Sequence, residues 1–261
     1  PRPYPEDGTG TERRYTHAVS LSWLPEGVRT RIEACVEAIQ RGAGEKLVSV
    51  LLVGAAAHPP RYRGEGTPQL LIVLRDAPVP VLTNLGHQVG GATCVGLRLQ
   101  VLTERELLRG ADVFSLELAE YRDRHVLLYG ARPLLDDIHF TDAELRLAIE
   151  RALRTLTREV RDALVMRAAD LDGLMLSAVD RLVVIAQHLI RILGADDRGP
   201  EEEVVLVQLG EHVSVSVDGL LDVLKRCRSG EGAAGAVGLA VELLQLAEAA
   251  TRAADSFGSA E

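Results

Sequence analysis

The chain has 261 residues, of which 47% are hydrophobic, and this allows one large domain or two of ordinary size with a real core. The net charge of −9 argues against nonspecific binding to nucleic acid or to an anionic membrane, because both need a basic surface. The sequence shows neither an apolar signal core nor an uninterrupted apolar run of membrane-spanning length, so we expect a cytoplasmic protein with no membrane partner.

Residues 1–20 are rich in proline, glycine and charged residues, which predicts a flexible N-terminal tail. The fold is expected to begin near Leu21. Pro25 suits the first turn of a helix, and Gly42 is placed to end that helix. Four apolar residues between them repeat at helical spacing and predict a helix that covers one face of a sheet: Val28, Ile32, Val36 and Ile39.

Two runs rich in valine, isoleucine and leucine, 47–53 and 70–74, predict buried strands. The connection between them is long and contains several glycines and prolines. A short helix is expected over 79–89. Alternating apolar residues predict a third strand over 94–102, and a short apolar run predicts a fourth over 125–129.

These elements predict an α+β domain with a mixed sheet over 21–137, and the remaining chain, 138–261, is expected to form an all-α helical bundle. The pattern changes at Thr141, which forms a capping-box pattern with Glu144 at the start of a long amphipathic helix. Four more helices are expected at about 174–193, 200–209, 217–227 and 233–254.

The three cysteines, Cys35, Cys94 and Cys227, lie far apart and outside any paired ligand spacing. Such an odd, scattered set favours buried or partly buried free thiols in a reducing compartment and predicts no zinc site. Histidines in the rest of the chain are scattered too. We therefore expect no metal centre and no cofactor.

The layout of residues 47–74 resembles the nucleotidyltransferase superfamily. In that family a strand ends in Gly-Ser or Gly-Gly, a loop follows, and the next strand opens with two acidic residues one position apart. The glycine lets the backbone approach the nucleotide phosphates, and the two carboxylates share one strand face and hold Mg²⁺ against the triphosphate. The resemblance implies a nucleotidyltransferase-like sheet domain.

The residues at these positions differ from the family pattern. Gly54 matches the family glycine, but Ala55 stands where the family has Ser or Gly. Thr67 and Gln69 align with the two carboxylates, and neither supplies the anionic oxygen that Mg²⁺ requires. We therefore interpret these four residues as a vestigial nucleotide cleft, with no catalytic and no metal-binding residue.

The third family carboxylate aligns with Arg98 or Gln100 on the third predicted strand. An active site would need a shifted alignment that uses Glu65 of the loop or another acidic residue. Metal-free nucleotide sensing stays open as well, with Arg61 or Arg63 contacting phosphate.

The resemblance continues through 103–130, where an acidic helix precedes an Arg-His pair, an apolar run and Tyr-Gly. This order is similar to that of bacterial nucleotidyltransferase-domain proteins of similar length. The acidic residues of the helix are interpreted as a solvated face rather than a metal site: Asp112, Glu117, Glu120 and Asp123.

Arg181 and His188 lie seven residues apart on the second long helix, and therefore on one face. The pair resembles the arginine and histidine of HEPN-type ribonucleases, in which histidine acts in acid/base chemistry and arginine stabilises phosphate charge. The polar residue usual after the arginine is Leu182 here.

Besides metal-free nucleotide sensing, three functions remain open at this point. The preferred one is a catalytically degenerate nucleotidyltransferase-like protein that acts as a protein-interaction or assembly module, and its helical half would bind a protein partner or form a homo-oligomer. The alternatives are an active, metal-dependent nucleotidyltransferase that uses a nucleoside triphosphate, and a HEPN-like ribonuclease.

Overall fold

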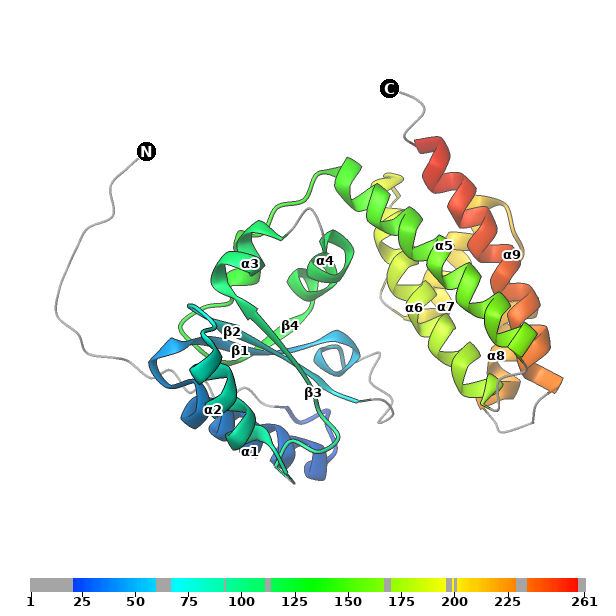
Figure 1. Cartoon of the computed structure of the whole chain (residues 1–261). Coiled ribbons are helices and arrows are strands. Elements are labelled where there is room, and N and C mark those ends of the chain that lie inside the picture. Colours follow the sequence, from blue (N-terminus) through cyan, green and yellow to red (C-terminus); the bar gives the residue numbers. More distant parts are fainter. Residues whose placement is uncertain are drawn as a thin grey trace.

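The computed structural model of the chain describes residues 21–59, 67–91, 93–110, 114–166, 170–195, 199, 201–228 and 234–257. The expected tail over 1–20, the loop residues Arg61, Arg63 and Glu65, and Asp112 lie outside the described residues. Figure 1 shows a sheet half, which runs from α1 to β4, beside a helical half, which runs from α5 to α9.

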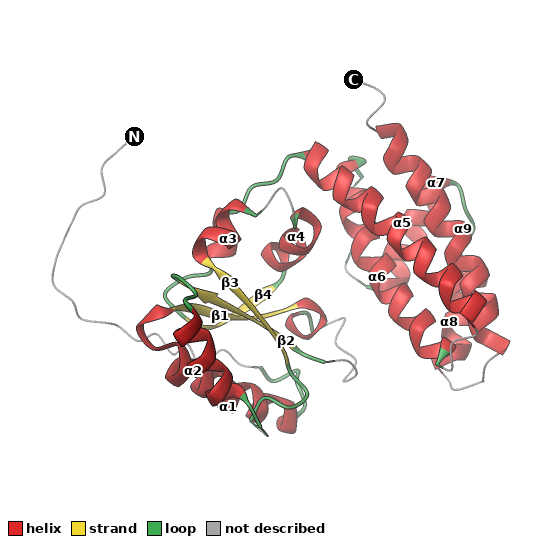
Figure 2. Ribbon diagram, viewed as in Figure 1, coloured by secondary structure: helices red, strands yellow, loops and turns green. Residues whose placement is uncertain are grey.

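Four strands form one mixed sheet in the order β3-β2-β1-β4. β1 pairs antiparallel with β2 and with β4, whereas β3 runs parallel to β2. The expected α+β class with a mixed sheet is confirmed (Figure 2). The third strand begins later than predicted, because residues 93–97 form a turn in which Gly96 has a φ of 77°. The strand bounds are Leu47–Val53 for β1, Gln69–Leu74 for β2, Arg98–Thr103 for β3 and His125–Tyr129 for β4.

Helices cover both faces of the sheet, because successive strand residues point to opposite sides. Val50 and Leu52 pack on the side of α1 and α2, and Leu51 and Val53 pack on the side of α3 and α4. The face that carries Leu51 also carries the functional site described below. The helix bounds are Glu26–Ala43 for α1, Val79–Val89 for α2, Glu104–Arg109 for α3 and Ser115–Asp123 for α4.

The helical half is a bundle with its own apolar core, as expected. Its first helix starts with the predicted capping box: the backbone N–H of Glu144 donates to Thr141 Oγ1 at 3.2 Å, and the backbone N–H of Thr141 donates to Glu144 Oε2 at 2.8 Å. The helix bounds are Asp142–Met166 for α5, Leu171–Ile192 for α6, Glu202–Val213 for α7, Asp218–Arg228 for α8 and Ala234–Phe257 for α9.

Helix α6 has the length and mean hydropathy of a membrane span, which the sequence analysis did not anticipate. However, 56% of its apolar window is buried within the protein, and α6 packs against α5, α7 and α9. Its composition is therefore accounted for by its central place in the bundle. The cytoplasmic location stays a prediction.

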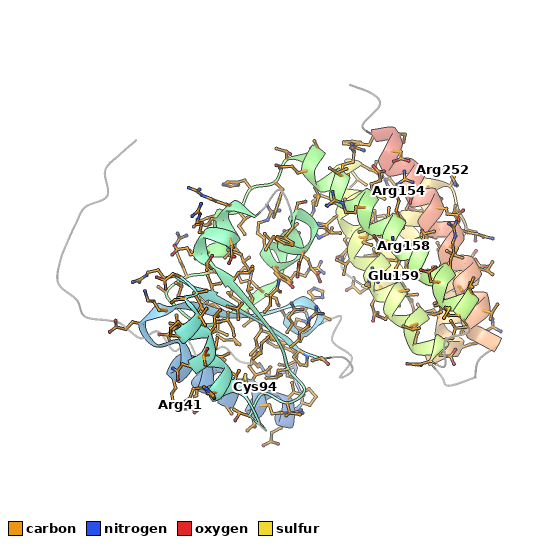
Figure 3. All side chains as sticks on the ribbon, viewed as in Figure 1. Arg41, Cys94, Arg154, Arg158, Glu159 and Arg252 are labelled. Atoms are coloured by element: carbon orange, nitrogen blue, oxygen red, sulfur yellow. A yellow bond between two sulfur atoms is a disulfide. The ribbon has the colours of Figure 1, made fainter. Side chains whose placement is uncertain are left out.

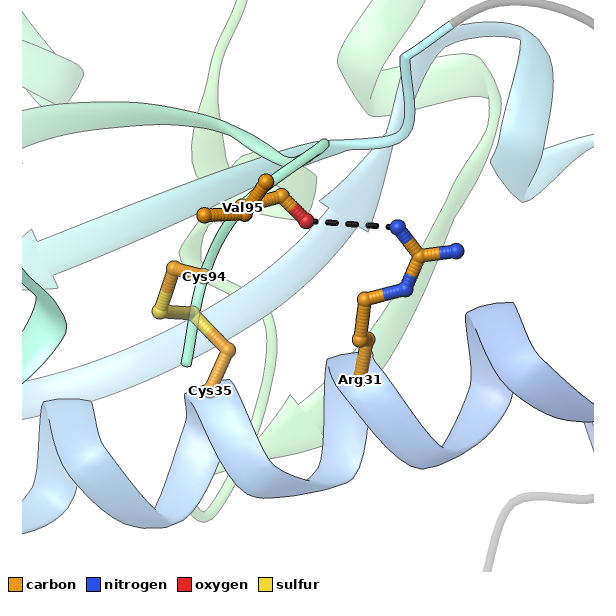
Figure 4. Close-up of a disulfide and its surroundings, with 4 residues drawn as sticks. All are labelled: Arg31, Cys35, Cys94 and Val95. Atoms are coloured by element: carbon orange, nitrogen blue, oxygen red, sulfur yellow. Dashed lines mark hydrogen bonds between the residues drawn. A yellow bond between two sulfur atoms is a disulfide. The ribbon is translucent and has the colours of Figure 1, made fainter. Parts of the chain in front are cut away.

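Cys35 and Cys94 form a disulfide with a Cα–Cα distance of 5.3 Å, so the prediction of free thiols is wrong for these two residues. Cys35 lies on α1, and Cys94 lies in the turn before β3. This turn passes over α1 (Figures 3 and 4). A separation of 59 residues hides this contact from any local pattern. The side chain of Cys227 lies outside the described residues.

Candidate functional site

A cleft of about 410 Å³ lies between the two halves of the chain. The sheet half contributes the turn after β1, the first residues of β2 and β3, and one side of α4. The helical half contributes α5 and α6, with Ser177, Asp180, Arg181 and Ile185 among the lining residues. The helical half therefore builds one wall of the cleft, a role that the sequence analysis did not assign to it.

Three of the four predicted cleft residues line this cleft: Gly54, Ala55 and Gln69. Thr67 is exposed and is not among the lining residues, because β2 begins only at Gln69. Arg98, predicted at the third carboxylate position, also lines the cleft and lies opposite Gln69 in the parallel ladder. The structure thus brings the first residues of β2 and β3 to the edge of one cleft, and their role as a nucleotide site stays a prediction.

The turn after β1 is fixed by backbone geometry and by one long-range hydrogen bond. Gly54 has a φ of 71°, a left-handed conformation that favours glycine, and the space around its Cα is open. The indole Nε1 of Trp23 donates to the carbonyl oxygen of Ala56 at 3.0 Å. This bond holds the short helical turn over Gly54–Ala57 at the edge of the cleft.

Gln69, predicted at a family carboxylate position, bonds to Gln100, one of the two candidates for the third position, and both bond to α4. Gln69 Nε2 donates to Gln100 Oε1 at 2.8 Å and to the Tyr121 hydroxyl at 2.5 Å. Gln100 Nε2 donates to Glu117 Oε1 at 3.2 Å. The Tyr121 hydroxyl lies 2.7 Å from Glu117 Oε1 and donates to it, which leaves the hydroxyl oxygen free to accept from Gln69. All four side chains are hydrogen-bonded in one network.

Tyr121 keeps its proton in this network. Burial raises the pKa of its hydroxyl, and the negative charge of Glu117 raises that pKa further. The residue therefore acts as a neutral hydrogen-bond donor, not as a base. The described part of the chain contains no group of three or more His, Cys, Asp or Glu side chains placed to hold a metal ion.

The acidic residues of α4 lie on the side of the helix that meets the helical half; Glu117 and Glu120 are half-buried and Asp123 is exposed. Glu117 and Glu120 line the cleft, and Asp123 accepts a hydrogen bond from Arg191 of α6. Leu118 packs onto the sheet, while the acidic side of α4 turns to the helical half. Helical periodicity identifies the apolar face of a helix, but not what its polar face meets.

Arg181 and His188 occupy different surroundings on α6. Arg181 lines the cleft and forms an ion pair with Glu159 of α5. His188 is 3% exposed, and its pKa is lowered to about 4 by burial and by the charge of Arg191, against the opposing effect of Asp123. A buried, neutral imidazole has no access to an RNA phosphate, so this geometry argues against the ribonuclease interpretation.

No family model matches the chain, and no curated protein matches it significantly. Among solved structures, the chain is similar to the spectinomycin adenyltransferase AAD(9) from Enterococcus faecialis, determined with ATP and spectinomycin. The TM-score is 0.55 and the identity is 10%, over 84% of this chain and 98% of that chain. At this identity the likeness shows the fold alone, which is nucleotidyltransferase-like with a C-terminal helical region.

Proposed function

We propose that this chain is a nucleotidyltransferase-fold protein that no longer transfers nucleotides and that binds a small molecule in the cleft between its halves. The observation that carries the proposal is the amide network. Gln69 and Gln100 stand at the positions that supply carboxylates in the family, and each is hydrogen-bonded where a metal ligand would need a free anionic oxygen.

The charges of the cleft favour a ligand with an amino group. Three carboxylates come from both halves: Glu117 and Glu120 on α4, and Asp180 on α6. The cations among the described lining residues are Arg98 on the sheet side and Arg181 on α6, and Arg181 forms an ion pair with Glu159. Carboxylates therefore outnumber cations among the described lining residues, which favours a protonated amine over a triphosphate as the ligand. The solved neighbour was determined with spectinomycin as well as ATP, which supports a small molecule as the ligand class.

We expect calorimetry to detect binding of spectinomycin or of spermidine, two amine-bearing probes. Replacing Asp180 by Asn should weaken this binding by at least about tenfold, because a hydrogen bond to a charged group contributes roughly 1.5–3 kcal/mol. Glu203→Gln on the exposed side of α7 is the matched control and should leave the affinity unchanged. The proposal fails if neither amine binds, or if both variants behave like the wild-type chain.

Assembly through the helical half is a second candidate function. Val237 and Val241 lie one turn apart on α9 and are 52% and 47% exposed, so α9 presents an apolar pair to solvent. In this candidate function the pair binds a second copy of the chain.

Light scattering after size exclusion should then show a discrete dimer, and Val237→Glu with Val241→Glu should convert it to a monomer. Val165→Glu, an exposed apolar residue near the end of α5, is the control and should retain the dimer. A wild-type chain that remains monomeric at high concentration rules this candidate out.

A further inference from the structure

The disulfide links α1 to the turn that leads into β3. Cys35 is fully buried and Cys94 is 8% exposed. A second link lies beside it, where Arg31 Nη1 donates to the carbonyl oxygen of Val95 at 3.3 Å (Figure 4). Of these two links, only the disulfide is covalent and changes with redox conditions.

The strand that follows this turn forms part of the cleft. Arg98 is its first residue and lines the cleft, and Gln100 belongs to the amide network. β3 is one of the two edge strands and, within the described part of the chain, pairs with β2 alone, so its first residues depend on that ladder and on the preceding turn. The backbone N–H of Arg98 donates to the carbonyl oxygen of Pro68 at 2.9 Å, at the end of the ladder where the turn begins. The disulfide therefore anchors one edge of the cleft to α1.

The same turn has the properties of a segment that opens locally. Val95 is 60% exposed, and Gly96 holds a left-handed conformation with a φ of 77°. Few buried apolar contacts and an exposed backbone lower the free energy of local opening relative to global unfolding. Because Cys94 is only 8% exposed, a reductant would reach its sulfur through a local opening of this turn.

We propose that the Cys35–Cys94 disulfide is a redox switch that sets the position of the β3 edge and thereby the affinity of the cleft. A thiolate of a dithiol reductant attacks Cys94 Sγ, the S–S bond breaks, and Cys35 leaves as a thiolate that takes up a proton. The second thiol of the reductant then attacks the mixed disulfide and releases Cys94 as a thiol. Two electrons and two protons pass from the dithiol to the two cysteines, and the reductant becomes a disulfide. Reduction frees the turn, the first residues of β3 lose their anchor, and the cleft binds its ligand more weakly.

The opening of β3 is measured by hydrogen exchange on the folded, full-length chain. We expect reduced thioredoxin or dithiothreitol, without denaturant, to expose both cysteines to alkylation. Exchange protection over residues 93–103 should fall by about tenfold, while protection in α5 and α9 stays constant, and reoxidation should restore it.

Cys35→Ala with Cys94→Ala should show the reduced pattern in oxidising buffer and should not respond to the dithiol. Cys227→Ser is the matched control and should respond like the wild-type chain. The switch is overturned if the disulfide resists reduction in the folded chain. It is also overturned if reduction leaves exchange over 93–103 unchanged or increases exchange throughout the chain.

The effect on ligand affinity rests on the proposed function, in which the cleft binds an amine. Titration of the oxidised and reduced chains with spermidine separates amine binding from redox control of the β3 edge. A several-fold weaker affinity in the reduced chain supports control of the cleft, whereas equal affinity in both forms overturns that control. If neither form binds an amine while exchange over 93–103 still follows the redox state, the proposed function fails and the redox-controlled opening of β3 stands.

Discussion

Replacing Gln69 and Gln100 by glutamate is expected to create a magnesium site where the wild-type chain has a pair of amides. The substitutions keep side-chain length, so carboxylate oxygens take the places of amide atoms that lie 2.8 Å apart. That spacing matches the edge of an Mg²⁺ octahedron, about 2.9 Å for metal–oxygen distances of 2.0–2.1 Å. Glu117, within 3.2 Å of Gln100, would supply a third carboxylate.

Without the metal, the double variant should melt below the wild-type chain, because three carboxylates repel one another. Magnesium at about one hundred times its dissociation constant should then stabilise the variant by about 2.7 kcal/mol, or roughly 5–10 °C in the melting temperature. Thermal melts in magnesium and in sodium at equal ionic strength measure the difference. Gln245→Glu, exposed on α9, should show no magnesium response. If magnesium does not raise the melting temperature of the double variant, β2 and β3 do not hold the side chains at positions 69 and 100 close enough to share a metal ion.

Acidification is expected to destabilise the chain through His188 on α6. This residue is buried at the contact with α4, where Arg191 bonds to Asp123 and where Arg122 and Arg124 add positive charge. In the folded chain its pKa is lowered from 6.5 to about 4, so the unfolded chain takes up the proton at a higher pH than the folded chain does. The stability that neutral His188 provides is therefore complete above about pH 6.5 and is lost as the pH falls toward 4.

A shift of this size corresponds to a loss of roughly 3 kcal/mol, at about 1.4 kcal/mol for each pH unit. Urea unfolding at several pH values between 6.5 and 4 measures the free energy of unfolding. This free energy should fall with decreasing pH in the wild-type chain, and its slope against pH should be smaller in His188→Gln. His87→Gln, at an exposed position on α2, is the control and should retain the wild-type slope. Equal slopes in all three chains would mean that His188 titrates normally and is not enclosed by the contact between the halves.

The regular elements of the sheet half were predictable because their signals are local. Apolar runs followed by a glycine defined β1 and β4 to the residue, and helical spacing between Pro25 and Gly42 predicted α1. The resemblance to the family pointed to the start of β2, but it paired Gln69 with Thr67, and only Gln69 lines the cleft. Strand residues two apart share a face, and in the structure Gln69 lies on the same face as Leu71.

The rest of the site depends on contacts between distant segments. Tyr121 reaches Gln69 and Glu117 reaches Gln100 only because α4 packs on that side of the sheet. Asp180 reaches the cleft only because α6 lies across from it. The disulfide has the same origin, since 59 residues separate its cysteines. Periodicity describes one element at a time, so such pairings follow from tertiary packing alone.

The most direct test of the account is a calorimetric titration of the wild-type chain with ATP, with and without magnesium. We predict no magnesium-dependent binding, because Gln69 and Gln100 offer amides that are already hydrogen-bonded, and because the neighbouring Glu117 repels the triphosphate. Magnesium-dependent binding of ATP in the micromolar range would contradict the account and would show that the cleft still assembles a metal–nucleotide site.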